Sequence, residues 1–490
     1  MQANELILIA EAHAGLKTQL VKASLVAAAE YRLDAPAFLA RQNVDGLLQF
    51  SGQGQTVSDL ADVFTVYIQS PVLAYVRPFS NSRPYMTTSE LAEYENGRAT
   101  HVSLTADPRL IGWEIREGNI VVSRSGRVGE AYWVDKRLDG VLVGDSFRVV
   151  PKKTEDRFFL YALLSSSMAR NYLSGSAYGS VVDHASLDQL RRFPIPPVDT
   201  EVRKQVSEKV QRALQSREEA YDFIDKAKDL LHRVNSLLPL LQLPVSRSEK
   251  FSFVHSVVSS NELLDSSGNS SEFRLEAHFH NPTSRAAIKS IRACSSENKQ
   301  LGELAEQVFF CNRFTRTYVE EKHGIPYLAG KNIVQIRPRI EHYLSISETA
   351  GLDSYKLQRG WSLITCSGTI GRTCFVWHNF EKYVATHDLI RVVSDESKID
   401  PGYLHAFLSS PYGYEQIMRF RYGSVIDHVT PDQMKKVLVP IPSPAQQKEI
   451  GDKVRLAYEK RAEALRLEDE AQEILMRGIK GHNIPESQNV

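Results

Sequence analysis

The sequence is poor in cysteine and has no long apolar run. Its four cysteines are Cys294, Cys311, Cys366 and Cys374. Because none of them forms a Cys-x-x-Cys pair, we predict neither a zinc site nor a disulfide framework, and a reducing cytoplasm suits the chain best. No stretch of about 18 apolar residues is present, so we expect no membrane-spanning helix and no membrane partner. A basic segment followed by a small-residue cleavage site is also missing, so no secretory signal is expected.

Net charge is the second thing that the sequence lacks. Lysine plus arginine and aspartate plus glutamate number 59 each, so the formal net charge is zero. A protein that binds DNA tightly by itself usually carries a basic excess. This balance argues against DNA binding by the chain alone. It does not argue against DNA binding within a complex whose other subunits carry the positive charge.

Catalytic and cofactor-binding motifs are missing as well. Gly15–Thr18 resembles the end of a phosphate-binding loop but lacks its first glycine, and no strand–GxGxxG–helix unit occurs. Asn81–Tyr85 is faintly similar to the Asn-Pro-Pro-Tyr loop of amino-methyltransferases but lacks the paired prolines, and we interpret it as the entry to a strand. His184 and His428 each follow an aspartate without a nucleophile motif nearby, which favours a structural or phosphate-contacting role over acid–base catalysis. We therefore predict no catalytic residue, no bound cofactor and no metal site.

The sequence does contain an internal repeat. Tyr178–His184 (Tyr-Gly-Ser-Val-Val-Asp-His) returns as Tyr422–His428 (Tyr-Gly-Ser-Val-Ile-Asp-His). Three further blocks return in the same order at nearly the same spacing. The block at Glu30 returns at Glu272, the block at Arg124 returns at Cys366, and the block at Phe159 returns at Tyr403. Solenoid repeats have periods of 20–50 residues, so a period this long indicates two whole domains. At 490 residues the chain has room for them.

Each copy begins with a mixed globule, roughly residues 30–197 and 272–442. Short β-branched runs bounded by glycine, such as Asn119–Ser123 and Trp361–Thr365, predict strands. Helical spacing occurs instead in the two segments Phe158–Tyr172 and Gly402–Met418. The predicted fold class is α+β, with two pseudo-repeated globular domains.

A long amphipathic helix is predicted after each globule, over residues 198–240 and 443–480. Apolar residues recur there at steps of three, four or seven, which places them on one stripe. Ser443-Pro444-Ala445-Gln446 has the pattern of a capping box. At 1.5 Å per residue, helices of roughly 35–40 residues extend about 50–60 Å and need a partner of similar length. We predict that the two helices pack antiparallel as a coiled-coil spacer; independent packing of each helix on its own globule is the alternative.

Two further segments have no counterpart in the repeat. Residues 1–29 have the spacing of an extra amphipathic helix, which would pack against the paired helices or dock a partner. Residues 241–271 are rich in serine and asparagine and are predicted to be a linker between the copies.

Polar turns with glycine lie between the predicted strands of both copies. They include Ser125-Gly126-Arg127, Ser367-Gly368-Thr369 with Arg372, and the arginine-rich segment Arg419–Ser424. Such amides, hydroxyls and guanidinium groups suit phosphate contacts, and arginine also binds guanine edges. Glycine turns with solvated arginines are the alternative interpretation.

Several loose motifs recur in both halves in the same order. They are the Arg-Leu-Asp-Ala and Arg-Leu-Glu-Ala starts, the Ser367–Arg372 turn, the Gly-Ser…Asp block, the Pro-Ile-Pro exits at Pro194–Pro196 and Pro440–Pro442, and Gln446–Ile450 (Gln-Gln-Lys-Glu-Ile). With this order the chain resembles the specificity subunit of Type I restriction–modification systems, across nearly its whole length. The first copy departs from the pattern where Arg127 replaces threonine and at Val202–Val206, a poorer helix start.

The resemblance implies a non-catalytic, DNA-reading subunit for phage defence. The globules would be target recognition domains for an asymmetric, bipartite site in double-stranded DNA, and the helices would set the spacing between its halves. Two methyltransferase (modification) subunits would bind the helices and methylate adenine with S-adenosylmethionine. A motor-nuclease (restriction) subunit would add cleavage that depends on ATP and Mg²⁺. These cofactors would belong to the partners, with none in this chain.

Candidate contacts follow from that resemblance and from the polar turns. For DNA they are Arg124, Ser125, Arg127, Tyr178, Ser180, His184, Ser367, Thr369, Arg372, Arg421, Tyr422, Ser424 and His428. For the partner subunits they are Val206, Val210, Ile224, Ile450, Val454 and Leu465. Two other interpretations stay open, a degenerate methyltransferase with duplicated domains and a paired-helix interaction scaffold that does not touch DNA.

Overall fold

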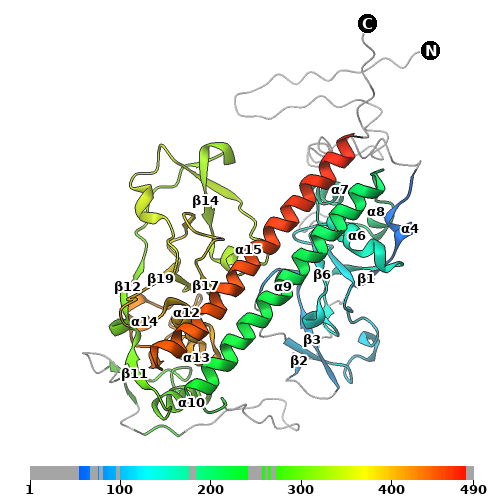
Figure 1. The fold of residues 1–490 in the computed structure, drawn as a ribbon. Coiled ribbons are helices and arrows are strands. Elements are labelled where there is room, and N and C mark those ends of the chain that lie inside the picture. The colour runs from blue at the N-terminus through cyan, green and yellow to red at the C-terminus, as the bar shows by residue number, and fades with distance from the viewer. Residues whose placement is uncertain are drawn as a thin grey trace, which may run out of the picture. The chain divides into compact units, whose positions relative to one another are not determined.

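The structure of the chain is a computed structural model in which the chain divides into two compact units (Figure 1). It describes residues 54–66, 75–76, 81–94, 100–175, 184–240, 257–259, 263–265 and 272–481. Unit 1 consists of Met1–Ala92, Asn96–Ala213 and Arg466–Val490, and unit 2 of Glu93–Glu95 and Leu214–Leu465. The predicted helix at residues 1–29 lies outside the described residues, as does most of the predicted linker at residues 241–271.

Both units contain the same pair of four-stranded sheets. The order in the first sheet of unit 1 is β1 (Ala61–Val66), β8 (Ser146–Pro151), β5 (Ile120–Ser123) and β6 (Ala131–Trp133), and in unit 2 it is β12 (Ala305–Phe310), β19 (Leu389–Ser394), β16 (Ser362–Thr365) and β17 (Thr373–Phe375). All neighbours in these sheets are antiparallel. Mixed helix and sheet content was predicted from the sequence, and it is confirmed.

The second sheet is also repeated, including its one parallel pair. Its order in unit 1 is β2 (Tyr75–Val76), β4 (Thr100–Ser103), β3 (Ser82–Met86) and β7 (Leu142–Val143), and in unit 2 it is β13 (Tyr318–Val319), β15 (His342–Ser345), β14 (Gly324–Leu328) and β18 (Val384–Ala385). The last two strands of each sheet run parallel. Within the Asn81–Tyr85 segment, Ser82–Tyr85 belong to strand β3, in agreement with the predicted strand entry.

Short helices and small sheets complete the two units. Unit 1 contains α4 (Val57–Leu60), α5 (Thr88–Leu91), α6 (Arg157–Leu164), α7 (Ser167–Gly175) and α8 (Leu187–Arg191). Unit 2 contains α10 (Pro282–Arg292), α11 (Leu301–Leu304), α12 (Pro401–Ser409), α13 (Pro411–Arg419), α14 (Pro431–Lys435) and the pairs β9 (Leu264–Asp265) with β10 (Glu272–Phe273) and β11 (Glu297–Gln300) with β20 (Leu438–Ile441).

The two helical segments predicted within the globules are each broken in the middle. Ser410 ends α12 and caps α13, since its hydroxyl accepts from the Gly413 amide at 3.3 Å. Pro411 has no amide hydrogen to continue the preceding helix but suits the first position of a new one. In unit 1, Ser166 accepts in the same way from the Ala169 amide at 3.1 Å. The repeat thus preserves a helix break that apolar spacing alone does not reveal.

Two long helices follow the globules. Helix α9 covers Thr200–Val234, 35 residues, and α15 covers Pro444–Gly481, 38 residues. The capping box predicted at Ser443 is present, because its backbone amide donates to the Gln446 side chain at 3.1 Å and its hydroxyl accepts from the Gln446 amide at 3.4 Å. Helix α9 ends before residue 240 because Ser236 takes a left-handed conformation with φ of 51°.

Segments of α9 and α15 pack together inside each unit. In unit 1, Val202 lies against Gly478, and Lys209 pairs with Glu470 at 2.5 Å. In unit 2, Glu219 pairs with Lys460 at 2.9 Å. In each pair the two residue numbers add up to 679 or 680, so the paired segments within each unit run antiparallel. Both helices also bury an alanine every seven residues, namely Ala213, Ala220 and Ala227 in α9 and Ala457, Ala464 and Ala471 in α15.

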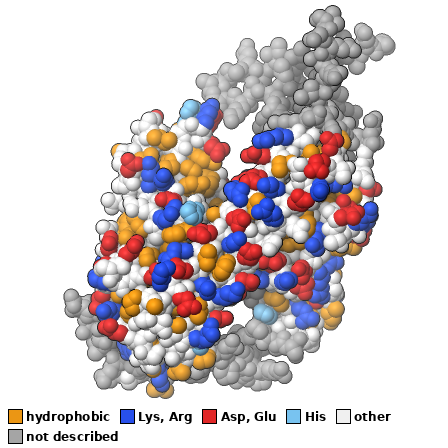
Figure 2. Space-filling view, viewed as in Figure 1, with side chains coloured by type: hydrophobic (Ala, Val, Ile, Leu, Met, Phe, Trp, Pro, Cys, Tyr) orange, Lys and Arg blue, Asp and Glu red, His pale blue; other side chains and the backbone are white. Residues whose placement is uncertain are grey.

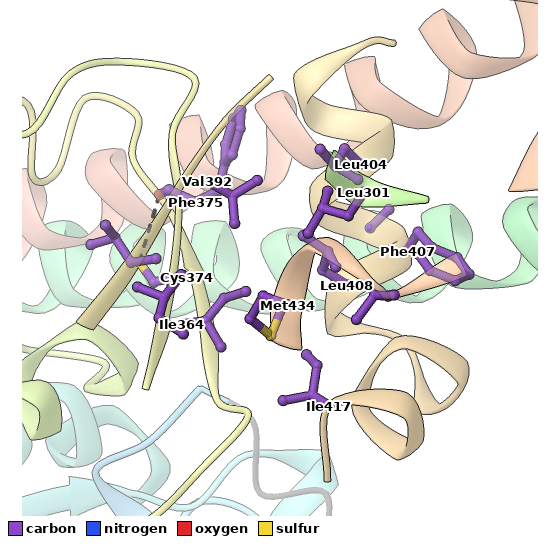
Figure 3. Packing of buried hydrophobic residues seen from close by; sticks show 14 of the residues in the cluster. Leu301, Ile364, Cys374, Phe375, Val392, Leu404, Phe407, Leu408, Ile417 and Met434 are labelled. Atoms are coloured by element: carbon purple, nitrogen blue, oxygen red, sulfur yellow. Dashed lines mark hydrogen bonds between the residues drawn. The ribbon is translucent and has the colours of Figure 1, made fainter. Parts of the chain in front are cut away.

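The core of unit 2 is shown in Figure 3, where side chains from strands, short helices and α11 pack together. Phe375 and Phe407 are fully buried there, and so is Ile364 of β16. Each such side chain contributes about 1.5–3 kcal/mol when it leaves water. Tyr458 of α15 reaches into this core and accepts a hydrogen bond from the Phe375 amide at 2.9 Å. The long helix is therefore part of the unit's interior.

Candidate nucleic-acid interface

One edge of the first sheet gathers the polar segments of unit 2. The register pairs Phe310 with Ile390 and Thr365 with Leu389, so β12 and β16 end where β19 begins. Residues 311–317, 366–372 and 386–388 consequently emerge side by side. We call these three segments, with residues 421–428, the unit 2 edge. The fourth segment joins them because Ser367 forms a β-bridge with His428, and the Val429 amide donates to the Cys366 carbonyl at 3.0 Å.

Unit 1 has the corresponding edge. Ser146 is the register partner of both Val66 and Ser123, so β1 and β5 end where β8 begins. Ser125 forms a β-bridge with His184, and the Ala185 amide donates to the Arg124 carbonyl at 2.9 Å. We call residues 124–130, 144–145 and 184–185 the unit 1 edge. Tyr178 and Ser180, two predicted DNA contacts, lie outside the described residues.

The turn at each edge has the same backbone. Gly129 and Gly371 donate from their amides to the carbonyls of Ser123 and Thr365, both at 2.9 Å. Their φ angles are 81° and 80°, a region that favours glycine. A Cβ at Gly371 would lie 3.1 Å from the ring of Tyr414. This close approach explains why both copies contain glycine at this position of the turn.

The charges at the unit 1 edge are largely compensated. Arg124 donates to Asp145 at 2.7 Å, and the Ser125 hydroxyl donates to the other oxygen of the same carboxylate. His184 lies 3.9 Å from Asp145, and Arg127 lies 3.9 Å from Glu130. The predicted residues Arg124, Ser125 and His184 are therefore brought together around a carboxylate that the sequence analysis did not identify. Asp145 has φ of 46°, which turns the backbone at this corner.

The unit 2 edge has no counterpart of the Arg124–Asp145 ion pair among its described residues. Cys366 occupies the position of Arg124, and burial raises the pKa of its thiol to about 12, so it carries no charge. Arg372 donates to the carboxylate of Glu93, which belongs to unit 2. Ser367 is half-buried and Thr369 is exposed. The two edges therefore share a backbone but differ in charge.

Residues 421–428 form a small hairpin at the unit 2 edge. The amides of Tyr422 and His428 donate to each other's carbonyls, at 2.9 and 2.7 Å. Arg421 lies 3.6 Å from Asp427, and Ser424 is exposed. The hairpin holds the four predicted contacts Arg421, Tyr422, Ser424 and His428 close together, next to the Ser367 turn.

Two arginines at the unit 2 edge were not among the residues predicted from the sequence. Arg313 and Arg316 are exposed in the segment Asn312–Arg316, which directly follows β12. Arg316 donates to Nδ1 of His387 at 3.0 Å and lies 5.3 Å from the centre of the Tyr327 ring. The signal available in the sequence was two arginines on either side of Phe314, immediately after an apolar run.

A buried arginine fixes the third segment of the unit 2 edge. Arg391 is 1% exposed and donates to the carbonyls of Leu389 and Ala385 at 2.6 and 2.8 Å. Burial lowers its pKa. In unit 1 the corresponding Arg148 donates to the Glu114 carbonyl at 2.9 Å. The Arg391 side chain therefore holds a strand connection in place and is not available to a ligand.

Comparison with known proteins identifies the domain. Residues 295–459 match the family described as Type I restriction modification DNA specificity domain. Residues 295–459 of this chain are therefore similar to a Type I specificity domain. The resemblance drawn from the sequence motifs is thereby confirmed, and the match includes the whole unit 2 edge. The sequence matches no curated protein.

Three solved structures are similar at low identity. They are the S subunit of a Type I restriction-modification system from M. genitalium (13% identity, 87% of this chain, 94% of that chain, TM-score 0.34), an HsdS subunit from Thermoanaerobacter tengcongensis (15%, 87%, 96%, 0.28) and a structure on complex assembly of the type I R-M system (16%, 86%, 97%, 0.27). These TM-scores are too low for the likeness to carry structural detail.

The predicted partner-binding residues lie mostly inside the chain itself. Val206 and Val210 are buried in unit 1, Ile224, Ile450 and Val454 are buried in unit 2, and Leu465 is half-buried. Partner binding by this stripe stays a prediction.

The surface around the specificity domain carries mixed charge. Figure 2 shows lysine and arginine interspersed with aspartate and glutamate over the face in view. Among the residues that the structure describes, no group of three or more His, Cys, Asp or Glu is placed to hold a metal ion. None of the described helices is both long and apolar enough to cross a membrane.

Proposed function

We propose that this chain is the DNA sequence-recognition subunit of a Type I restriction–modification complex. Each unit reads one half of an asymmetric, bipartite target through its sheet edge. The chain itself catalyses neither methylation nor cleavage, and bound S-adenosylmethionine, ATP and Mg²⁺ belong to partner subunits. The complex acts in the cytoplasm, where its DNA target lies.

The observation that carries this proposal is the duplicated edge. The Ser125 and Ser367 turns have the same glycine conformation and the same bridge to a histidine, at His184 and His428. A shared backbone with different side chains suits two related half-sites that differ in sequence. Hydroxyls, amides and guanidinium groups on short turns are the groups that contact phosphates and base edges.

The long helices support the spacing role. We propose that α9 and α15 lie antiparallel along their whole length, as their pairings within each unit do, and set the distance between the half-sites. Antiparallel helices relate the two recognition domains by an approximate two-fold axis, which matches the local dyad of duplex DNA. Methyltransferase subunits dock on the polar faces of this spacer, because its apolar stripe is already buried.

The zero net charge fits a subunit that binds DNA only within its complex. Phosphate neutralisation by lysine and arginine supplies most non-specific affinity for DNA. A chain without a basic excess relies on its partners for that contribution and supplies mainly sequence discrimination.

A genome-wide map of N6-methyladenine tests the proposal. Host cells with and without the gene are compared while the methyltransferase subunit is expressed in both. We expect deletion to erase one split, asymmetric motif. An unchanged map contradicts the reading role and favours the scaffold. Stoichiometric binding of S-adenosylmethionine by the purified chain contradicts it in a different way and favours a degenerate methyltransferase.

A further inference from the structure

The arginines that the sequence placed at the two edges are compensated by carboxylates. Arg124 pairs with Asp145, and Arg372 pairs with Glu93. Arg421 lies 3.6 Å from Asp427. A guanidinium that is already bound to a carboxylate must give up that partner before it contacts DNA. These three residues are therefore weak candidates for reading bases.

Arg313 and Arg316 are in a different position. Both are exposed, and within the described residues neither lies within ion-pair distance of a carboxylate. Arg316 is oriented by Nδ1 of His387, whose Nε2 lies 3.3 Å from Asp388, and by the face of the Tyr327 ring. Burial and the nearby arginines lower the pKa of His387, which keeps its ring neutral and able to accept this hydrogen bond. An oriented arginine loses less conformational entropy on binding.

Phe314 anchors the segment between the two arginines. Its ring stacks on Tyr355 with 4.2 Å between centroids and an interplanar angle of 25°. It packs beside Tyr327, Leu344 and Val384, which form a small buried cluster. The backbone of Asn312–Arg316 is thus attached to the sheet, while the arginines on either side of the anchor remain exposed. Preorganised side chains of this kind suit recognition better than a solvated loop does.

The two copies also differ in chemistry at this segment. Cys311–Thr317 connects β12 to β13, and the same connection in the first copy is Tyr67–Ala74. That counterpart lies outside the described residues, but its sequence, Tyr-Ile-Gln-Ser-Pro-Val-Leu-Ala, contains no charged residue. Equivalent segments thus carry two arginines in one copy and none in the other.

We propose that Arg313 and Arg316 read bases in the half-site bound by unit 2, and that this pair makes the two half-sites differ. The inference rests on the proposed function. Arginine binds O6 and N7 of guanine in a bidentate manner, so the expected bases are guanines. The half-site read by unit 1 lacks this contact because its equivalent segment has no arginine.

The test uses the complete complex and a matched control. Arg313→Gln and Arg316→Gln are compared with Arg359→Gln. Arg359 also donates to a histidine Nδ1, that of His378 at 3.2 Å, and lies 5.0 Å from the centre of the Trp377 ring. It differs in that it also donates to the carboxylate of Glu381 at 2.9 Å. It sits just before β16, at the opposite end of that strand from Thr365. Because Arg359→Gln also loses the ion pair with Glu381, it should cost at least as much folding stability as Arg313→Gln or Arg316→Gln. Only the latter two variants should lose base reading.

Methylated positions are mapped in cells for each variant and for the wild type. We expect Arg316→Gln or Arg313→Gln to relax one position in one half of the motif, with discrimination there falling about 5–150-fold. The other half and the Arg359→Gln map should be unchanged. An even loss at all sites, an unchanged motif in both arginine variants, or equal relaxation by Arg359→Gln overturns the inference. If the wild type itself directs no split motif, the proposed function fails instead.

Discussion

Arg372 donates to the carboxylate of Glu93, a residue 279 positions earlier in the chain. Glu93 also forms a β-bridge with Gln335, so the pair fixes two segments of unit 2. The neighbouring Tyr94 lies edge-on to Tyr221, with 5.9 Å between ring centres, and the Arg461 guanidinium is 4.0 Å from its ring centre. These contacts of Glu93 and Tyr94 fix two residues of the first copy within unit 2.

The first prediction concerns this pair. Glu93→Gln and Arg372→Gln should each destabilise unit 2. The double variant should lose less free energy of unfolding than the two single variants lose together. The side chains are 19% and 33% exposed, so we expect a coupling energy of about 1 kcal/mol. Urea denaturation of the four proteins measures it. Arg372→Gln should leave the methylation motif unchanged; a relaxed base in that variant would restore Arg372 as a DNA contact.

The glycines of the Ser367 turn should differ in their tolerance of alanine. Gly368 has φ of 70° with nothing within 4 Å of an added Cβ, so Gly368→Ala should cost only the left-handed backbone, about 1–2 kcal/mol. Gly371→Ala adds a contact of 3.1 Å with the Tyr414 ring, and should cost a further 1–3 kcal/mol or so. Thermal melts compare the two variants. Equal melting temperatures would contradict the close approach.

Local chemistry allowed much of the fold to be predicted from sequence. The helix start at Ser443 is encoded by four adjacent residues, and the strand at Ser362–Thr365 by β-branched and apolar neighbours bounded by glycine. The repeat added a second, independent instance of each element. What spacing missed was the interruption at Ser410 and Pro411, because the apolar residues keep their helical period across it.

The candidate site was less predictable because its chemistry depends on long-range pairing. Arg124 and Arg372 read as exposed cations in the sequence, yet their carboxylates lie 21 and 279 residues away. Conversely, Arg316 became a candidate only when the register placed the end of β12 beside Leu389 and brought His387 next to it. Apolar stripes were found correctly, but sequence alone could not tell whether Val454 faced its own core or another subunit.

Unit 2 should become less stable in mild acid because of His405. The ring is fully buried, and burial lowers its pKa to about 3 from an ordinary 6.5. Its Nδ1 lies 3.2 Å from the Ser362 hydroxyl. The folded unit keeps His405 neutral, whereas the unfolded chain binds a proton below about pH 6.5. Stability is therefore lost as pH falls from 6.5 towards 3, by up to about 1.4 kcal/mol per pH unit, with no change above 6.5.

Urea midpoints between pH 4 and 8 check this expectation. His405→Gln should lower stability at pH 8 by about 1–2 kcal/mol through the lost contact with Ser362. Below pH 6.5, however, the stability of this variant should fall less steeply with pH than that of the wild type. His323→Gln, at an exposed position, is the matched control and should leave the slope as in the wild type. Parallel curves for wild type and His405→Gln would show that His405 does not cause the acid dependence.

The last prediction tests the spacer directly. Removal of residues 211–217 from α9 and 462–468 from α15 deletes stretches that face each other in the antiparallel pairing. The residue numbers 211 and 468, and 217 and 462, add up to 679, as in the observed ion pairs. Seven residues is the interval at which Ala213, Ala220 and Ala227 are buried, so the deletion should keep the buried stripe in phase. About 10 Å of helix is lost, which corresponds to up to about three base pairs at 3.4 Å each.

The methylation map of this double deletion should show the same two half-sites separated by a shorter gap. Deletion of 211–217 alone breaks the pairing between the helices and should abolish methylation, which makes it the appropriate control. The two half-sites should keep their sequences because neither sheet edge is altered. A gap of unchanged length in an active double-deletion variant would mean that the distance between half-sites is set elsewhere, and the spacer role of α9 and α15 would have to be given up.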